Sequence, residues 1–145
     1  MGVDRRNQSK LLGATYEQRF VYESMLRGLY AHSPPADMPC HDFIVLNQHN
    51  TCLLTQVRSS NSMHTRGTGK SARFKVQTRC EAKRSSLKDA GVDVLSIFVV
   101  PYETWYHIPT GDLTATCVNL MPHIIGSKGT WEKYKGAWGI FDRKS

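Results

Sequence analysis

The sequence contains no apolar run long enough to cross a lipid bilayer. Its first residues, Met1 to Arg6, contain no apolar core of the kind that a secretory signal needs. No internal repeat and no linker-like stretch divides its 145 residues. We therefore expect a single domain, residues 1–145, with no membrane association and in a reducing, cytosolic compartment.

Acidic residues are also few, at 12 against 19 lysines and arginines, which gives a formal net charge of +7. This excess favours a polyanionic partner, and nucleic acid is the usual one. A basic structural or RNA-associated protein is the alternative at this point. The stretch 67–70, GTGK, lacks the preceding glycine of a P-loop, so we do not expect an NTPase.

Close pairs of metal-ligating residues are scarce as well. The four cysteines form no CxxC pair, and Cys40-His41 has no matching second pair, so a zinc site is not expected. Their wide spread does not resemble a disulfide framework, and we expect small buried thiols. The six histidines are scattered. His41 could orient a ligand or water because it adjoins Asp42, whereas His107 is expected to be structural or exposed.

Residues 13–30 predict an amphipathic helix, because apolar side chains recur at helical spacing at Tyr16, Phe20, Val21, Met25 and Leu29. Thr15 and Gln18 have the spacing of a capping box, and Gly28 is suited to a C-terminal stop. Residues 1–12 are basic and polar, and they form either an N-terminal arm or the first turn of this helix.

Several strands follow, predicted by β-branched and apolar runs between turn-forming residues, at 43–47, 52–60, 73–79, 92–101 and 104–109. The stretch 80–91 is expected to be a loop or short helix. The tail, 128–141, is expected to form a closing helix or extended segment. This order predicts an α+β or mixed α/β domain, with a central mixed sheet flanked by helices.

Four polar residues have the spacing of a metal-dependent nuclease site. Asp42 starts one predicted strand, and Gln56 and Arg58 share a face of the next because they are two residues apart. Glu17 could reach this face from the helix. Carboxylate and amide oxygens suit Mg²⁺, and a nearby cation can stabilise phosphate charge. Alternatively, Gln56 and Arg58 simply line the solvated face of an edge strand.

The sequence resembles the PD-(D/E)XK nuclease superfamily in the order of its motifs from about residue 13 onward. The motifs that carry the resemblance are the helix GATYEQRFVYESMLRGLY, the strands HDFIVL and TQVRSS, the segment GVDVLSIFVVPYETWYHIPTGDL and the tail WEKYKGAWGIF. Within the superfamily, it is most similar to the small single-domain branch that includes group I intron homing endonucleases and archaeal Holliday-junction resolvases.

The resemblance implies a restriction-endonuclease-like core and cleavage of double-stranded DNA with Mg²⁺ or Mn²⁺. It assigns Glu17, Asp42 and Gln56 as metal ligands, and the same three residues with Arg58 as the catalytic set. It further implies a homodimer or homotetramer in the cytoplasm of a prokaryotic or phage-infected cell.

Arg58 departs from the family pattern, which has lysine at this position. An arginine keeps the positive charge but cannot deprotonate, and its planar fork is suited to bridging phosphate oxygens. It therefore either clamps the scissile phosphate or marks a protein that binds DNA without cutting it. Lys70 or Lys75 could supply a migrated lysine.

Basic residues crowd the sequence after this strand, and Arg73, Lys75, Gln77 and Arg79 alternate along the predicted strand 73–79. Such a face could track phosphates and read base edges. The alternative is a solvated strand face. The predicted DNA-binding residues are Arg66, Lys70, Arg73, Lys75, Gln77 and Arg79.

Overall fold

The computed structural model describes residues 5–35, 40–63, 72–80 and 84–144. The described chain contains one α-helix, α1 (Arg5–Leu26). Its nine strands are β1 (Tyr30–His32), β2 (Phe43–Leu46), β3 (Cys52–Ser60), β4 (Phe74–Gln77), β5 (Arg79–Cys80), β6 (Ser85–Ser86), β7 (Val94–Val99), β8 (Thr104–Pro109) and β9 (Cys117–Leu120). Short 3-10 turns occur at Val100–Tyr102, Thr110–Asp112, Glu132–Tyr134 and Trp138–Phe141.

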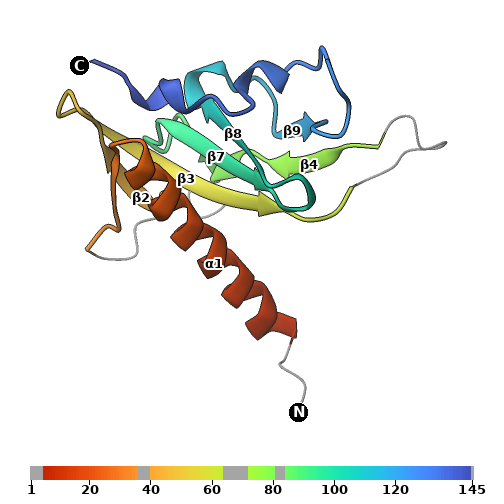
Figure 1. Cartoon of the computed structure of the whole chain (residues 1–145), viewed down its shortest axis with the longest axis horizontal. Helices are drawn as coiled ribbons and strands as arrows, with labels where there is room; N and C mark the ends of the chain where they lie inside the picture. Colours follow the sequence, from red (N-terminus) through yellow and green to blue (C-terminus); the bar gives the residue numbers. More distant parts are fainter. Residues whose placement is uncertain (1–4, 36–39, 64–71, 81–83, 145) are drawn as a thin grey trace.

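The central sheet has five strands in the order β1-β2-β3-β7-β8 (Figure 1). Only β3 and β7 run parallel, and the other neighbours are antiparallel. All six residues of β7 are buried, as its continuous apolar run predicts. The prediction of a mixed α+β domain with a central mixed sheet is confirmed, although the described residues contain a single α-helix.

Two apolar clusters lie on opposite faces of this sheet. On one face, Phe20 of α1 is fully buried against β2, β3 and the C-terminal turn. On the other face, Phe74 and Val76 of β4 pack with β7, β8 and β9. The strand pair β4–β9 therefore covers the face of the sheet opposite to α1.

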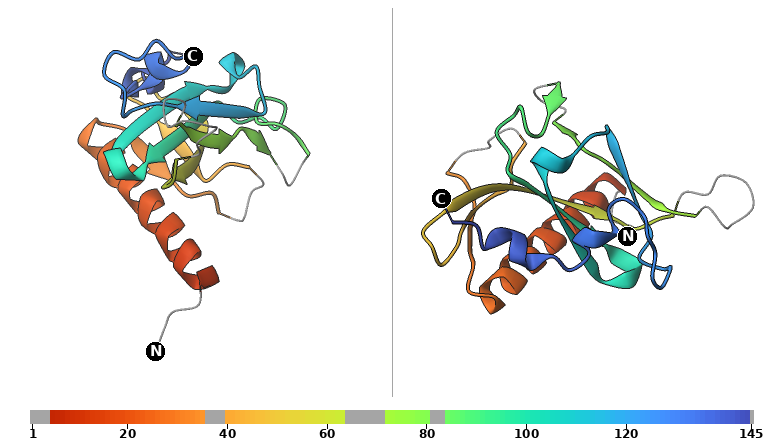
Figure 2. Two further views of the ribbon diagram at one scale, coloured as in Figure 1. Left: turned by 90° about the vertical axis from the view of Figure 1, so that its right-hand side faces the viewer. Right: turned by 90° about the horizontal axis from the view of Figure 1, so that it is seen from above.

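Helix α1 begins at Arg5, so of the two alternatives for residues 1–12 the described part, 5–12, forms the start of the helix. Thr15 lies in its middle and donates its hydroxyl to the Leu11 carbonyl at 2.8 Å, so the predicted capping box is wrong. Residues 5–12 belong to the helix and extend beyond the sheet, as two views show (Figures 1 and 2). Gly28, at φ +74°, follows the helix as predicted, and Leu29 donates to the Ser24 carbonyl at 2.9 Å.

Two strands, a hairpin and the form of the tail differ from the predictions. The strands β1 and β9 were not predicted, and the stretch expected to be a loop or short helix contains the β5–β6 pair. The tail folds as 3-10 turns rather than a closing helix or an extended segment. Met25 was expected on the buried face of α1, but it is 63 % exposed.

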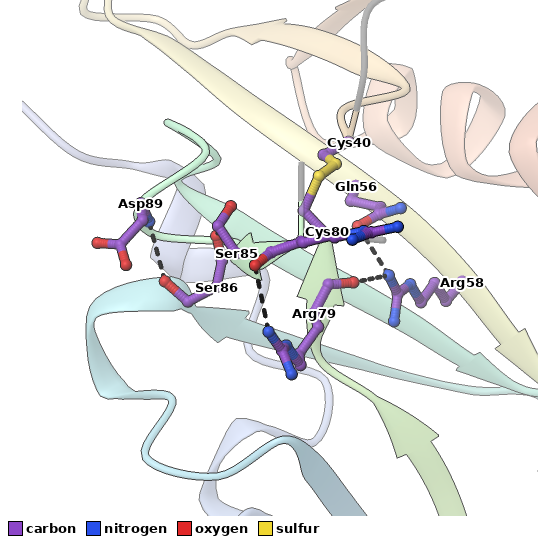
Figure 3. The surroundings of a disulfide bond; sticks show 9 residues. Cys40, Gln56, Arg58, Arg79, Cys80, Ser85, Ser86 and Asp89 are labelled. Carbon is purple, nitrogen blue, oxygen red and sulfur yellow. Dashed lines mark hydrogen bonds between the residues drawn. A yellow bond between two sulfur atoms is a disulfide. The ribbon is translucent and has the colours of Figure 1, made fainter. Parts of the chain in front are cut away.

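Cys40 and Cys80 form a disulfide, with Cα atoms 5.3 Å apart. The expectation of four separate thiols is therefore wrong for this pair, whereas Cys52 and Cys117 are free. The bond joins the segment before β2 to β5 (Figure 3). It fixes two segments that are 40 residues apart in sequence beside the same part of β3.

Candidate functional site

Asp42 lies directly before β2, opposite Gln56 of β3. The antiparallel β2–β3 register pairs Phe43 with Thr55. Extending this register by one residue before β2 places Asp42 opposite Gln56. Asp42 donates its backbone N–H to the Thr55 carbonyl at 2.9 Å, and its Oδ2 accepts the Val57 N–H at 2.8 Å. These bonds hold the Asp42 backbone and carboxylate against the segment of β3 that contains Gln56.

Burial raises the pKa of the Asp42 carboxyl, and hydrogen bonding from the Val57 N–H with the charges of Arg58 and His41 partly offsets this rise. Burial also raises the pKa of Glu17, and the charge of Asp42 raises it further. The two carboxyls are therefore close enough to repel each other when both are ionised. A bound cation would relieve this repulsion.

Arg58 links the candidate site to the strand segment that follows β4. Its guanidinium donates to the backbone carbonyls of Gln77 and Arg79, the latter at 2.7 Å. The same nitrogen that contacts Arg79 also lies 3.2 Å from Gln56 Oε1 (Figure 3). The structure thus places Asp42 opposite Gln56, brings Arg58 into contact with Gln56, and puts Glu17 within electrostatic reach of Asp42.

Among the described residues, no group of three or more His, Cys, Asp and Glu side chains is arranged to hold a metal ion. The candidate donor set has two carboxylates, from Glu17 and Asp42, and would be completed by the amide oxygen of Gln56. His41 is 8 % exposed and its charge acts on Asp42, so it lies within electrostatic reach of that carboxylate.

Two other polar residues near the sheet have structural environments. Asp93 Oδ2 accepts the Leu54 N–H at 2.9 Å, which ties the start of β7 to β3. His107 is fully buried, and its Nδ1 lies 2.7 Å from Ser96 Oγ. Burial lowers the pKa of His107 to about 3, so this imidazole is neutral at physiological pH. For His107, this environment agrees with the structural one of the two alternatives expected from the sequence.

The strand β4 and its continuation show the predicted alternation. Lys75, Gln77 and Arg79 are exposed, whereas Phe74 and Val76 are buried. Arg73 is half-buried at the start of this face. Two other predicted DNA-binding residues, at positions 66 and 70, lie outside the described residues. The three exposed side chains form one face, which we call the β4 face.

A surface cavity of about 490 Å³ lies at the end of the β4 face. Its walls come from Gln77, Arg79, Cys80, Arg84, Thr116 and Cys117. Thr116 and Cys117 were not predicted, because the antiparallel pairing of β9 with β4 brings them here from about 40 residues away. The alternation of apolar and polar residues at Val118-Asn119-Leu120 is a local signal that could have suggested this strand.

The sequence matches no protein-family model and no curated protein. Among solved structures, the chain is similar to a bacterial homing endonuclease, I-Ssp6803I, with a TM-score of 0.71. The match covers 92 % of this chain and 93 % of the other, at 19 % sequence identity. The chain has the fold of this homing endonuclease.

This match extends over nearly the whole length of both chains. Within the described residues, no helix is both long and apolar enough to span a bilayer. At this level of identity the likeness establishes the fold.

Proposed function

We propose that the protein is a metal-dependent DNA endonuclease of the PD-(D/E)XK type, associated with an intron as a homing endonuclease. The observation that carries this proposal is the placement of Asp42 beside Gln56, within electrostatic reach of Glu17 and Arg58. The fold shared with a bacterial homing endonuclease supports the same conclusion.

The donor chemistry fits Mg²⁺ or Mn²⁺. Both ions accept hard oxygen ligands and retain several waters, so three protein oxygens suffice. Asp42, Glu17 and Gln56 would hold the ion. Burial is the main cause of the raised pKa of both carboxyls, and for Glu17 the charge of Asp42 adds to it.

When bound, the ion supplies a Lewis acid that polarises the scissile phosphate and makes water more acidic. The residues of the chain position these groups. The Val57 N–H holds the Asp42 carboxylate, and Arg58 holds the Gln56 carbonyl oxygen. In the net reaction, water adds hydroxide to phosphorus and a proton to the leaving sugar oxygen, and one P–O bond breaks.

The β4 face and the residues beyond it supply the DNA contacts in this proposal. Lys75 and Arg79 are exposed cations that can track phosphates, and Gln77 between them can reach a base edge. Arg73 would extend this surface at the start of β4. The residues at 66 and 70 complete the predicted set.

The proposed assembly is a homodimer or homotetramer. Helix α1 supports it, because large apolar side chains are exposed on it at Leu11, Tyr22, Met25 and Leu26. A cytoplasmic location stays a prediction. That prediction assumes a reducing compartment. The Cys40–Cys80 disulfide argues against this assumption, because disulfides are rare in reducing compartments.

The proposal is tested by incubating the purified chain with supercoiled DNA that contains the sequence flanking its own gene, with and without Mg²⁺ or Mn²⁺. We expect cleavage that requires the metal and is lost in Asp42→Ala. Cleavage that persists in Asp42→Ala would contradict the assigned site.

A second candidate function is a DNA-binding protein that no longer cuts. The hydrogen bonds of Arg58 to two backbone carbonyls favour this second candidate. They use guanidinium N–H groups that would otherwise bind a phosphate. This candidate predicts binding that falls steeply with salt and no cutting with any metal. Cleavage by the wild-type chain would exclude it.

Changing Gln56 to Glu should strengthen metal binding. The substitution adds a negative charge beside Asp42, so we expect the Mg²⁺ concentration for half-maximal cleavage to fall about tenfold. Gln8→Glu is the matched control, because Gln8 is exposed in the N-terminal part of α1. An unchanged or higher Mg²⁺ requirement in Gln56→Glu would argue against Gln56 as a ligand.

A further inference from the structure

The chain between β4 and β5 turns at Thr78, where two small sheets separate. β4 pairs with β9, whereas β5 pairs with β6. Thr78 faces the β9 side, donating its N–H to the Thr116 carbonyl at 2.9 Å and its hydroxyl to the Ala115 carbonyl at 2.6 Å. The carbonyls on either side of Thr78 belong to Gln77 and Arg79, and neither is used in these bonds.

Both of these carbonyls accept hydrogen bonds from Arg58. One guanidinium nitrogen contacts Gln77 and the other contacts Arg79, so the planar fork spans the turn. Lysine has a single nitrogen and no fixed planar arrangement of donors, so it cannot reproduce this geometry. The turn is therefore held between Arg58 on one side and the segment 115–116 on the other.

The same guanidinium also reaches the candidate metal site. Its second nitrogen lies 3.2 Å from Gln56 Oε1, and its positive charge lowers the pKa of Asp42. One side chain thus contacts a candidate ligand and the backbone of two residues of the β4 face. Gln77 and Arg79 are exposed and line the 490 Å³ cavity, so fixing their backbone fixes where their side chains can meet DNA.

We propose that Arg58 is a positioning residue that sets the β4 face relative to the Asp42–Gln56 site. This inference rests on the proposed function and assigns Arg58 a role other than contact with the scissile phosphate. In this role Arg58 matters through its geometry, whereas a phosphate clamp would matter through its charge. A charge-conserving substitution therefore separates the two roles.

The experiment compares Arg58→Lys, Arg58→Gln and the matched control Arg143→Lys, which changes an exposed arginine of the C-terminal tail. DNA affinity is measured in an Asp42→Asn background, where cutting cannot interfere. We expect Arg58→Lys and Arg58→Gln to bind DNA about tenfold more weakly than the parent, because a loosened face is less preorganised, and Arg143→Lys to bind as the parent does.

Cleavage kinetics give a second measurement, made in chains that keep the wild-type aspartate at position 42. For Arg58→Lys we expect KM to rise about tenfold, with a much smaller change in kcat. Amide hydrogen exchange of the segment 77–80 should also become faster in both Arg58 variants, and this measurement does not depend on any nuclease activity.

The proposal would be overturned if Arg58→Lys bound DNA as tightly as the parent and its segment 77–80 exchanged amide hydrogens at the parental rate. A kcat loss of about a hundredfold in Arg58→Gln with wild-type KM would also overturn it, because it would place Arg58 at the reacting phosphate. If the wild-type chain never cuts DNA, the proposed function fails, while the affinity and exchange measurements still decide the role of Arg58.

Discussion

Asp42→Asn should abolish cleavage without weakening the fold. The asparagine oxygen can still accept the Val57 N–H, so the local structure is retained while the charge that would hold the metal is removed. We expect cleavage to fall by at least about a hundredfold, the usual cost of losing one group that stabilises the transition state.

The same variant should be at least as stable as the wild type in the absence of metal. The pKa of Asp42 is raised in the folded state, so its contribution to stability is present at low pH and is lost as the pH rises through that pKa. The advantage of Asp42→Asn should therefore be larger at pH 7 than at pH 3. Urea unfolding of both chains at the two pH values, with EDTA present, measures this difference in the free energy of unfolding.

Two results would contradict this account of Asp42. One is a variant that is clearly less stable than the wild type at pH 7, which would make Asp42 a structural residue. The other is retained cleavage. Asp89→Asn is the matched control, because Asp89 is exposed on the turn after β6 and should change neither property.

Breaking the Cys40–Cys80 bond should produce the largest loss of stability. The bond closes a loop of 40 residues, and the chain-entropy account assigns a loop of this length about 3 to 4 kcal/mol of unfolding free energy. Cys40→Ser is the preferred variant because Cys40 is partly exposed, whereas Cys80 is fully buried. Its urea midpoint should match that of the reduced wild-type chain.

Cys52→Ser provides the control, since Cys52 is an exposed free thiol. Alkylation of the unfolded chain without reductant should label two cysteines, and alkylation after reduction should label all four. Labelling of four cysteines without reductant, or equal urea midpoints before and after reduction, would show that the bond does not form or does not stabilise the fold.

Local patterns in the sequence predicted the sheet well because they report burial directly. The apolar run at 94–99 became the fully buried β7, and the alternation at 74–77 became the two-faced β4. The two-residue spacing of Gln56 and Arg58 predicted their common face. Asp42 and Gln56 lie opposite each other because the β2–β3 hairpin is local in sequence, whereas their role as metal ligands stays a prediction.

Features that depend on distant segments could not be predicted in this way. Cys40 and Cys80 meet only because β5 lies next to the start of β2, and no spacing rule contains that information. The hydrogen bonds of Arg58 to Gln77 and Arg79 likewise depend on how β4 packs over β3. The capping-box spacing of Thr15 and Gln18 was outweighed by the longer helix in which both residues lie.

Metal binding by the isolated chain tests the central claim most directly, because it does not require knowledge of the DNA target. Titration calorimetry with Mn²⁺ at pH 7.5 would compare the wild type with Asp42→Asn and Asp89→Asn. The account predicts binding by the wild type and by Asp89→Asn, and none by Asp42→Asn. Equal binding by all three chains, or none by the wild type, would contradict a metal site built on Asp42.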